Sequence, residues 1–80
     1  MPTILRIDGF AIKIYFNDHA PAHVHVIKAE GEAIISLDPI VILRFWGMRR
    51  QDLAEAKRIV EENQTALLRS WRNIHGDQRP

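Results

Sequence analysis

The sequence contains no cysteine, so disulfide bonds, zinc thiolate sites and a cysteine nucleophile are excluded. It also has no apolar run near the roughly 18 residues that a membrane-spanning helix needs, and its charged beginning does not resemble a signal peptide. With 11 basic and 10 acidic residues, it lacks the strong net charge that would by itself indicate nucleic-acid binding. These absences favour a cytoplasmic protein without membrane association.

Length and composition predict one small globular domain that spans residues 1–80. Hydrophobic residues make up 46% of the chain and charged residues 26%, a balance that is not typical of disordered proteins. A core of this size is marginal without a disulfide, a metal or a partner. We therefore expect the chain to form a homo-oligomer or to bind another protein.

Alternating apolar residues predict four β-strands in the first half of the chain. Thr3–Ile7 and Phe10–Phe16 flank the turn signal Asp8-Gly9, which favours a hairpin. A third strand begins near His23, and a fourth covers Ala33–Leu37 after a turn at Lys28–Glu32. On the second and third strands, one face is expected to pack under a helix, and its residues are Phe10, Ile12, Ile14, Phe16, Val24 and Val26. The segment Pro39–Met48 is apolar but fits neither period, so a short helix and an added edge strand both stay open.

The segment Gln51–Ile74 has the strongest periodic pattern in the sequence. Its apolar residues recur at spacings of three and four, namely Leu53, Ala56, Ile59, Val60, Leu67, Leu68, Trp71 and Ile74. This pattern predicts one long amphipathic helix that ends at Gly76. The expected fold is therefore α+β, a four-stranded mainly antiparallel sheet followed by one long C-terminal helix packed on one face.

Three of the four histidines lie close together in the segment Asn17–Val26. On a strand, His23 and His25 leave the same face about 7 Å apart, and His19 can fold over them from the preceding turn. Three such imidazoles could hold a divalent metal such as zinc, with Asp18 as a further ligand or as an acceptor behind the ligands. In the alternative interpretation, the histidines only brace the turn.

The same face of the predicted sheet carries Lys13 and Tyr15, and Arg6 lies within reach on the first strand. A histidine pair that titrates near neutral pH can act as general base and general acid. Basic side chains can stabilise phosphate charge, and a tyrosine ring can stack on a base. This set predicts a ribonuclease without a cofactor, in which His23 and His25 are catalytic and the substrate is bound by Arg6, Lys13, Tyr15 and His19. Alternatively, Lys13 and Tyr15 are simply part of a solvated face.

Phe45 and Trp46 lie beside three arginines, Arg44, Arg49 and Arg50. Such a cluster can bind nucleic acid, but it more often marks an apolar contact surface. We predict that Phe45 and Trp46 form the centre of a protein interface.

Several motifs together resemble those of one known family. The chain opens with MPTILRIDGF, carries HAPAHVHV at residues 19–26, continues with Leu37-Asp38-Pro39 and contains IVEEN at residues 59–63. Over nearly its full length it resembles a family of short bacterial proteins of unknown function whose signature is His-x-Pro-Pro-His-Val-His-Val. Two positions depart from the family pattern. Ala22 replaces the second signature proline, and Arg49 stands where the family tends to have a serine, so no capping box can form with Asp52.

The resemblance also implies a biological context. Members of the family are commonly encoded beside another small protein, an arrangement that is similar to a type II toxin–antitoxin pair. This implies either a toxin directed at nucleic acid or a non-catalytic antitoxin or accessory partner. In both cases the protein encoded next to it is an expected partner, and RNA is a possible substrate.

Overall fold

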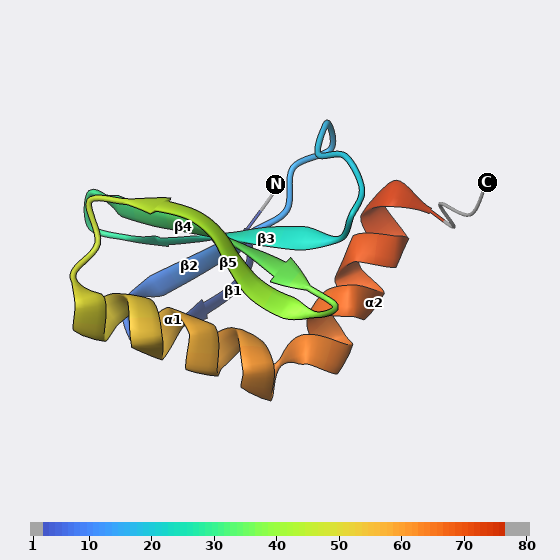
Figure 1. Ribbon diagram of the computed structural model, residues 1–80. Helices are drawn as coiled ribbons and strands as arrows, with labels where there is room; N and C mark the ends of the chain where they lie inside the picture. Colours follow the sequence, from blue (N-terminus) through green and yellow to red (C-terminus); the bar gives the residue numbers. More distant parts are fainter. Residues whose placement is uncertain (1–2, 77–80) are drawn as a thin grey trace.

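The computed structural model describes residues 3–76, which form a five-stranded sheet and two helices (Figure 1). The strands are β1 (Thr3–Ile7), β2 (Phe10–Lys13), β3 (His23–Lys28), β4 (Gly31–Leu37) and β5 (Ile40–Trp46). The helices are α1 (Arg50–Glu62) and α2 (Gln64–His75). Neighbouring strands are antiparallel and lie in the order β1-β2-β3-β4-β5, which confirms the α+β class. No helix among the described residues is long and apolar enough to cross a membrane.

The sheet has five strands rather than four because Ile40–Trp46 pairs with β4 and forms an edge. The register with β4 shifts between Ile34 and Ile35, where Leu43 is the extra residue of a β-bulge. As a result, Ile42 and Phe45 share a face although they are three residues apart. The extra residue shifts the alternation of the side chains between the two faces. The sequence of the strand therefore lacks the regular period of two that would have identified it.

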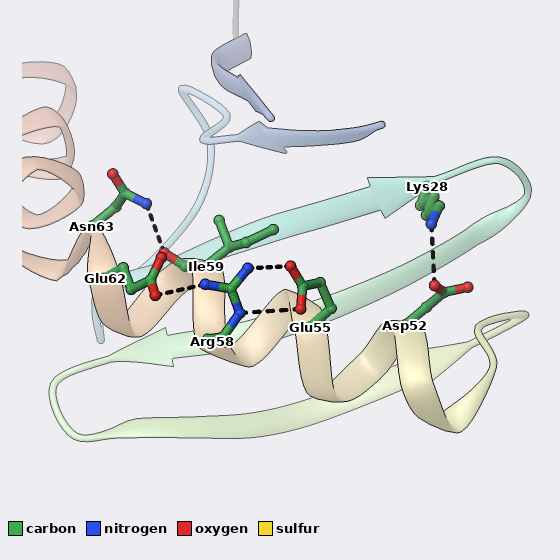
Figure 2. Close-up of polar contacts among 7 residues, drawn as sticks. All are labelled: Lys28, Asp52, Glu55, Arg58, Ile59, Glu62 and Asn63. Carbon is green, nitrogen blue, oxygen red and sulfur yellow. Dashed lines mark hydrogen bonds and ion pairs between the residues drawn. The ribbon is translucent and has the colours of Figure 1, made fainter. Parts of the chain in front are cut away.

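The prediction of one long helix is wrong, because the helix is interrupted at Asn63 between α1 and α2. The Asn63 side chain donates to the Ile59 carbonyl at 2.8 Å, and its backbone φ is −117° (Figure 2). Asparagine side chains compete in this way with the hydrogen bonds of the helix backbone. Gln64 then donates to the Leu37 carbonyl at 2.7 Å and fixes the start of α2 to the sheet.

β2 ends at Lys13, three residues before the predicted end of the second strand. A turn follows at once, in which the Asp18 N–H donates to the Tyr15 carbonyl at 3.1 Å. Phe16 lies in this turn and is 79% exposed, so its predicted place under the helix is wrong. Ile14, in contrast, is buried as expected.

The core lies between one face of the sheet and the two helices. The apolar residues of β2 and β3 that point to this face, among them Ile12, Val24 and Val26, are fully buried. The helices contribute the predicted stripe, of which Ala56, Ile59, Val60, Leu67 and Trp71 are buried. Figure 1 shows α1 running along this side of the sheet and α2 rising at the end where residues 14–22 connect β2 to β3.

The start of α1 has no side-chain cap, as the arginine at position 49 implied. Arg49 donates to the Asp52 carboxylate at 3.3 Å instead, and Lys28 of β3 donates to the same carboxylate at 3.1 Å (Figure 2 draws the Lys28 contact). The pair of Lys28 and Asp52 therefore links the first turn of α1 to the sheet. Further along α1, Arg58 forms ion pairs with Glu55 and Glu62.

Candidate metal centre

Asp18 lies in the loop between β2 and β3, and the loop backbone fixes its carboxylate. The Tyr15 N–H donates to Asp18 Oδ2 at 2.8 Å. This bond occupies one carboxylate oxygen and leaves the other, Oδ1, facing the histidines of β3.

His23 opens β3, and its ring is fixed by the same loop. Its Nδ1 lies 2.9 Å from the carbonyl oxygen of Pro21. A carbonyl only accepts hydrogen bonds, so Nδ1 carries the proton and Nε2 has a free lone pair in the neutral ring. That Nε2 lies 3.5 Å from Asp18 Oδ1.

His25 lies between two carboxylates. Its Nδ1 is 2.9 Å from Glu32 Oε2, and its Nε2 is 3.1 Å from Asp18 Oδ1. A neutral imidazole has one N–H and can donate to only one of these two groups. One of the two contacts therefore needs a further positive charge, either a second ring proton or a metal ion, and if Nδ1 donates to Glu32 that charge lies between Nε2 and Asp18.

These contacts bring three ligands together: Asp18, His23 and His25 each offer one ligand atom within 4.8 Å of the others, and Asp18 Oδ1 is the atom that both Nε2 atoms face. A further hydrogen bond fixes the far side of each group. The Tyr15 N–H donates to Asp18, His23 Nδ1 donates to the Pro21 carbonyl, and His25 Nδ1 bonds to Glu32. Histidine ligands of metal ions usually donate their second ring N–H to a carboxylate or a carbonyl. The cluster thus has ligand types and supporting hydrogen bonds that a divalent metal ion could use.

Aromatic rings surround the cluster and limit its contact with water. The Tyr15 ring meets the His25 ring edge-on at 4.7 Å between centroids, and the buried Trp71 ring of α2 lies 5.2 Å from that of His23. The side chains of Asp18, His23 and His25 are only 11%, 15% and 13% exposed. The three side chains are therefore largely shielded from water, more than on an open strand face.

The electrostatics of the site keep Asp18 ionised and Tyr15 neutral. Burial opposes ionisation of Asp18, but the hydrogen bonds from the Tyr15 N–H and from His25 outweigh it, so its pKa is lowered. Burial raises the pKa of Tyr15, and the nearby carboxylates of Glu32 and Asp18 raise it further. Asp18 is therefore available as an anionic ligand at neutral pH.

The other residues predicted for the site are distributed around it. Lys13 lies directly across from His25 in the register of β2 and β3 and shares its face. Arg6 pairs with Ala11 and lies on the same face of the sheet, one strand further out, with an exposed side chain. His19 is exposed in the loop and is not among the residues whose ligand atoms converge. Phe45 and Trp46, predicted as an interface, are exposed on β5.

Sequence reasoning missed the roles of Glu32 and Trp71 at this site. Glu32 was assigned to a turn, but the turn is shorter and Glu32 pairs with Ile27 in the β3–β4 hairpin. With a turn confined to Ala29 and Glu30, this pairing makes Glu32 a diagonal neighbour of His25. Trp71 was correctly assigned to the core, but no local signal in the sequence places a residue of α2 beside His23.

The fold and the cluster define a small α+β protein with a histidine–carboxylate centre at one end of an antiparallel sheet. The chain belongs to the family described as "Domain of unknown function (DUF4160)", whose model matches residues 9–72. The match includes every residue of the cluster, and it confirms the resemblance found in the sequence. No curated protein and no solved structure matches the chain.

Proposed function

We propose that this protein binds a divalent transition-metal ion, such as zinc, through Asp18 Oδ1, His23 Nε2 and His25 Nε2. The observation that carries the proposal is the convergence of these three acceptors around one small volume. Ligands about 2.1 Å from a tetrahedral zinc lie about 3.4 Å from one another. The distances of Asp18 Oδ1 from the two Nε2 atoms, 3.5 and 3.1 Å, have the same size.

The ligand set also fits the chemistry of such ions. Imidazole suits zinc, copper, iron and nickel, and two histidines with one carboxylate are a common set for zinc and non-haem iron. With His25 Nδ1 donating to Glu32, such an ion would supply the positive charge between His25 Nε2 and Asp18 Oδ1. Three protein ligands would leave at least one position for water or substrate, as catalytic rather than structural zinc sites do.

A metal ion with an open position supports hydrolysis, because it lowers the pKa of its bound water to about 7. The proposal keeps the ribonuclease-like toxin predicted from the sequence. In it a metal-bound water would do the acid–base work that the sequence assigned to His23 and His25. The two histidines are poorly arranged as a free acid–base pair, since both Nε2 atoms point at Asp18 and both rings are largely buried. A toxin that hydrolyses RNA remains the biological role that we propose for it.

Metal binding is tested by titrating the metal-free protein with zinc in a calorimeter. We expect one ion per chain, with binding lost in Asp18→Asn, His23→Ala and His25→Ala. His19→Ala is the matched comparison, because it removes an imidazole from the same loop without touching the cluster. Absence of binding, or loss of binding in His19→Ala alone, would contradict the proposal. Circular dichroism of each variant shows that the fold is intact.

The hydrolytic role is tested by induced expression and by RNA cleavage in vitro. We expect growth arrest and cleavage with the wild type, and neither with His25→Ala. Cleavage that continues after a chelator has removed the metal would restore the metal-independent ribonuclease predicted from the sequence. A harmless wild type that still binds zinc would instead identify the non-catalytic metal-binding partner that the sequence left open.

A further inference from the structure

We propose that the face of the sheet opposite the helices binds single-stranded nucleic acid and leads it to the metal centre. This assignment rests on the proposed function, because it names the substrate class of the same site. It also makes a separate claim about residues of β1, β2 and β5 that do not belong to the centre.

The register of the sheet gathers basic side chains on this face. Lys13 of β2, His25 of β3, Ile34 of β4 and Arg44 of β5 are successive cross-strand neighbours in one row. Adjacent strands are about 4.8 Å apart, so Arg44 and Lys13 flank His25 at about 10 and 5 Å along this row. Arg6 lies in the next row, and Trp46 lies at the opposite end of that same row.

The charge of this face fits a polyanion. Arg6, Lys13 and Arg44 are its basic residues, and Glu32 is the acidic residue that shares their rows. The Glu32 carboxylate is engaged by His25, whereas the three basic residues have no ion pair among the contacts found within the described residues. Backbone phosphates are the groups that such a set of cations neutralises.

Trp46 supplies a surface on which a base can stack. Its side chain is 44% exposed, and the Arg44 guanidinium lies 5.4 Å from its ring centroid. Single-strand binding sites combine basic residues along the backbone with exposed aromatic rings, and arginine adds cation–π contacts there. The sequence placed Trp46 in a protein interface, but the register puts it on the same face as the metal centre, whereas Phe45 points to the other face.

A single strand fits this surface better than a duplex does. The face is a sheet without a helix over it, since the core and both helices pack on the opposite side (Figure 1). Base edges in a duplex are reached through a groove by a helix or a two-stranded ribbon, and within residues 3–76 neither lies over this face. The bases of a single strand are free to stack on Trp46.

The test measures binding of fluorescein-labelled oligo(U) and oligo(dT) of about 12 nucleotides by fluorescence anisotropy. Metal-free wild type is used, so that binding is separated from hydrolysis and from metal affinity. We expect Trp46→Ala to weaken binding about tenfold. Arg44→Gln and Lys13→Gln should each reduce the slope of log affinity against log salt by about 0.7, which corresponds to one lost phosphate contact.

Arg69→Gln is the matched control, because Arg69 is exposed on α2 and belongs to the helix layer. It should leave both affinity and salt slope unchanged. Stronger binding of oligo(U) than of oligo(dT) would identify RNA, and the reverse would identify DNA. Absence of binding to either, or an equal loss in Arg69→Gln, would overturn the inference. Zinc binding without oligonucleotide binding would leave the proposed metal site standing and refute this inference. Oligonucleotide binding without zinc binding would support this inference and refute the proposed metal site.

Discussion

The proposed metal centre depends on which ring nitrogen of each histidine carries a proton. In both His23 and His25, Nδ1 has an oxygen partner at 2.9 Å, and this fixes Nε2 as the atom that faces Asp18. The two partners differ, because the Pro21 carbonyl is neutral whereas Glu32 is a carboxylate. A carboxylate behind a histidine makes the ring a more basic ligand. Glu32 should therefore affect metal affinity although it does not contact the ion.

We predict that Glu32→Gln weakens zinc binding by about 10- to 100-fold, the usual cost of losing a group behind a ligand. The glutamine side chain can still accept from His25 Nδ1, so the ring keeps its orientation. The loss of zinc affinity then measures mainly the effect of the missing negative charge. Calorimetric titration with zinc measures the effect. Glu30→Gln is the control, because Glu30 is exposed in the adjacent turn. A Glu32→Gln affinity equal to that of Glu30→Gln would show that Glu32 does not support the site.

At the scale of secondary structure, sequence patterns could identify the elements that alternate cleanly. The hairpin at Asp8-Gly9 forms as predicted, and both residues adopt positive φ, 52° and 83°. The sharing of one face by His23 and His25 is also confirmed. This correct placement of the histidines on β3 is what made the site predictable at all.

The two elements that were predicted incorrectly deviate for physical reasons that a local sequence pattern does not reveal. The bulge at Leu43 changes the phase of β5, and the break at Asn63 involves neither glycine nor proline. The apolar stripe continues across that break, so its period cannot reveal it. The contact of Trp71 with His23 joins residues that are distant in sequence, and only the packing of α2 against the end of the sheet creates it.

The link between α1 and β3 gives a pH-dependent prediction. The hydrogen bond from Lys28, drawn in Figure 2, lowers the pKa of Asp52. Arg49 lowers this pKa further despite partial desolvation. Because the folded pKa is below the unfolded value of about 3.9, the carboxylate stabilises the fold at neutral pH. That contribution is complete above the unfolded pKa and is lost as pH falls through the lower folded pKa.

We therefore expect Asp52→Asn to lower the melting temperature by a constant amount between about pH 5 and 8. The difference from wild type should shrink as the pH falls below about 3.9 and vanish once Asp52 is protonated in both states. Thermal melts followed by circular dichroism over this pH range measure it. Glu61→Gln is the control, because Glu61 is an exposed carboxylate of the same helix, and it should show no such pH dependence. A difference that persists at the acid end would mean that Asp52 acts through packing.

At the scale of the whole molecule, the sheet ends in an edge strand that leaves apolar side chains exposed. Val41, Leu43 and Phe45 of β5 are 45%, 50% and 53% exposed. Edge strands with unpaired backbone groups and apolar side chains are common sites of association. β5 is also one of the two longest strands of the sheet, so it offers the longer of the two edges. We propose that a second copy pairs with β5, which would join the two sheets and leave the face with Trp46 accessible.

We predict that the protein is a dimer at micromolar concentration and that Phe45→Glu makes it a monomer. The glutamate places a charge at the edge, where pairing would otherwise bury the ring of Phe45 against the second copy. Light scattering coupled to size-exclusion chromatography measures the mass. Phe16→Glu is the matched control, because Phe16 is equally apolar and 79% exposed but lies in the loop after β2. It should leave the dimer intact, whereas a monomeric wild type, or dissociation by both variants alike, would exclude association through β5.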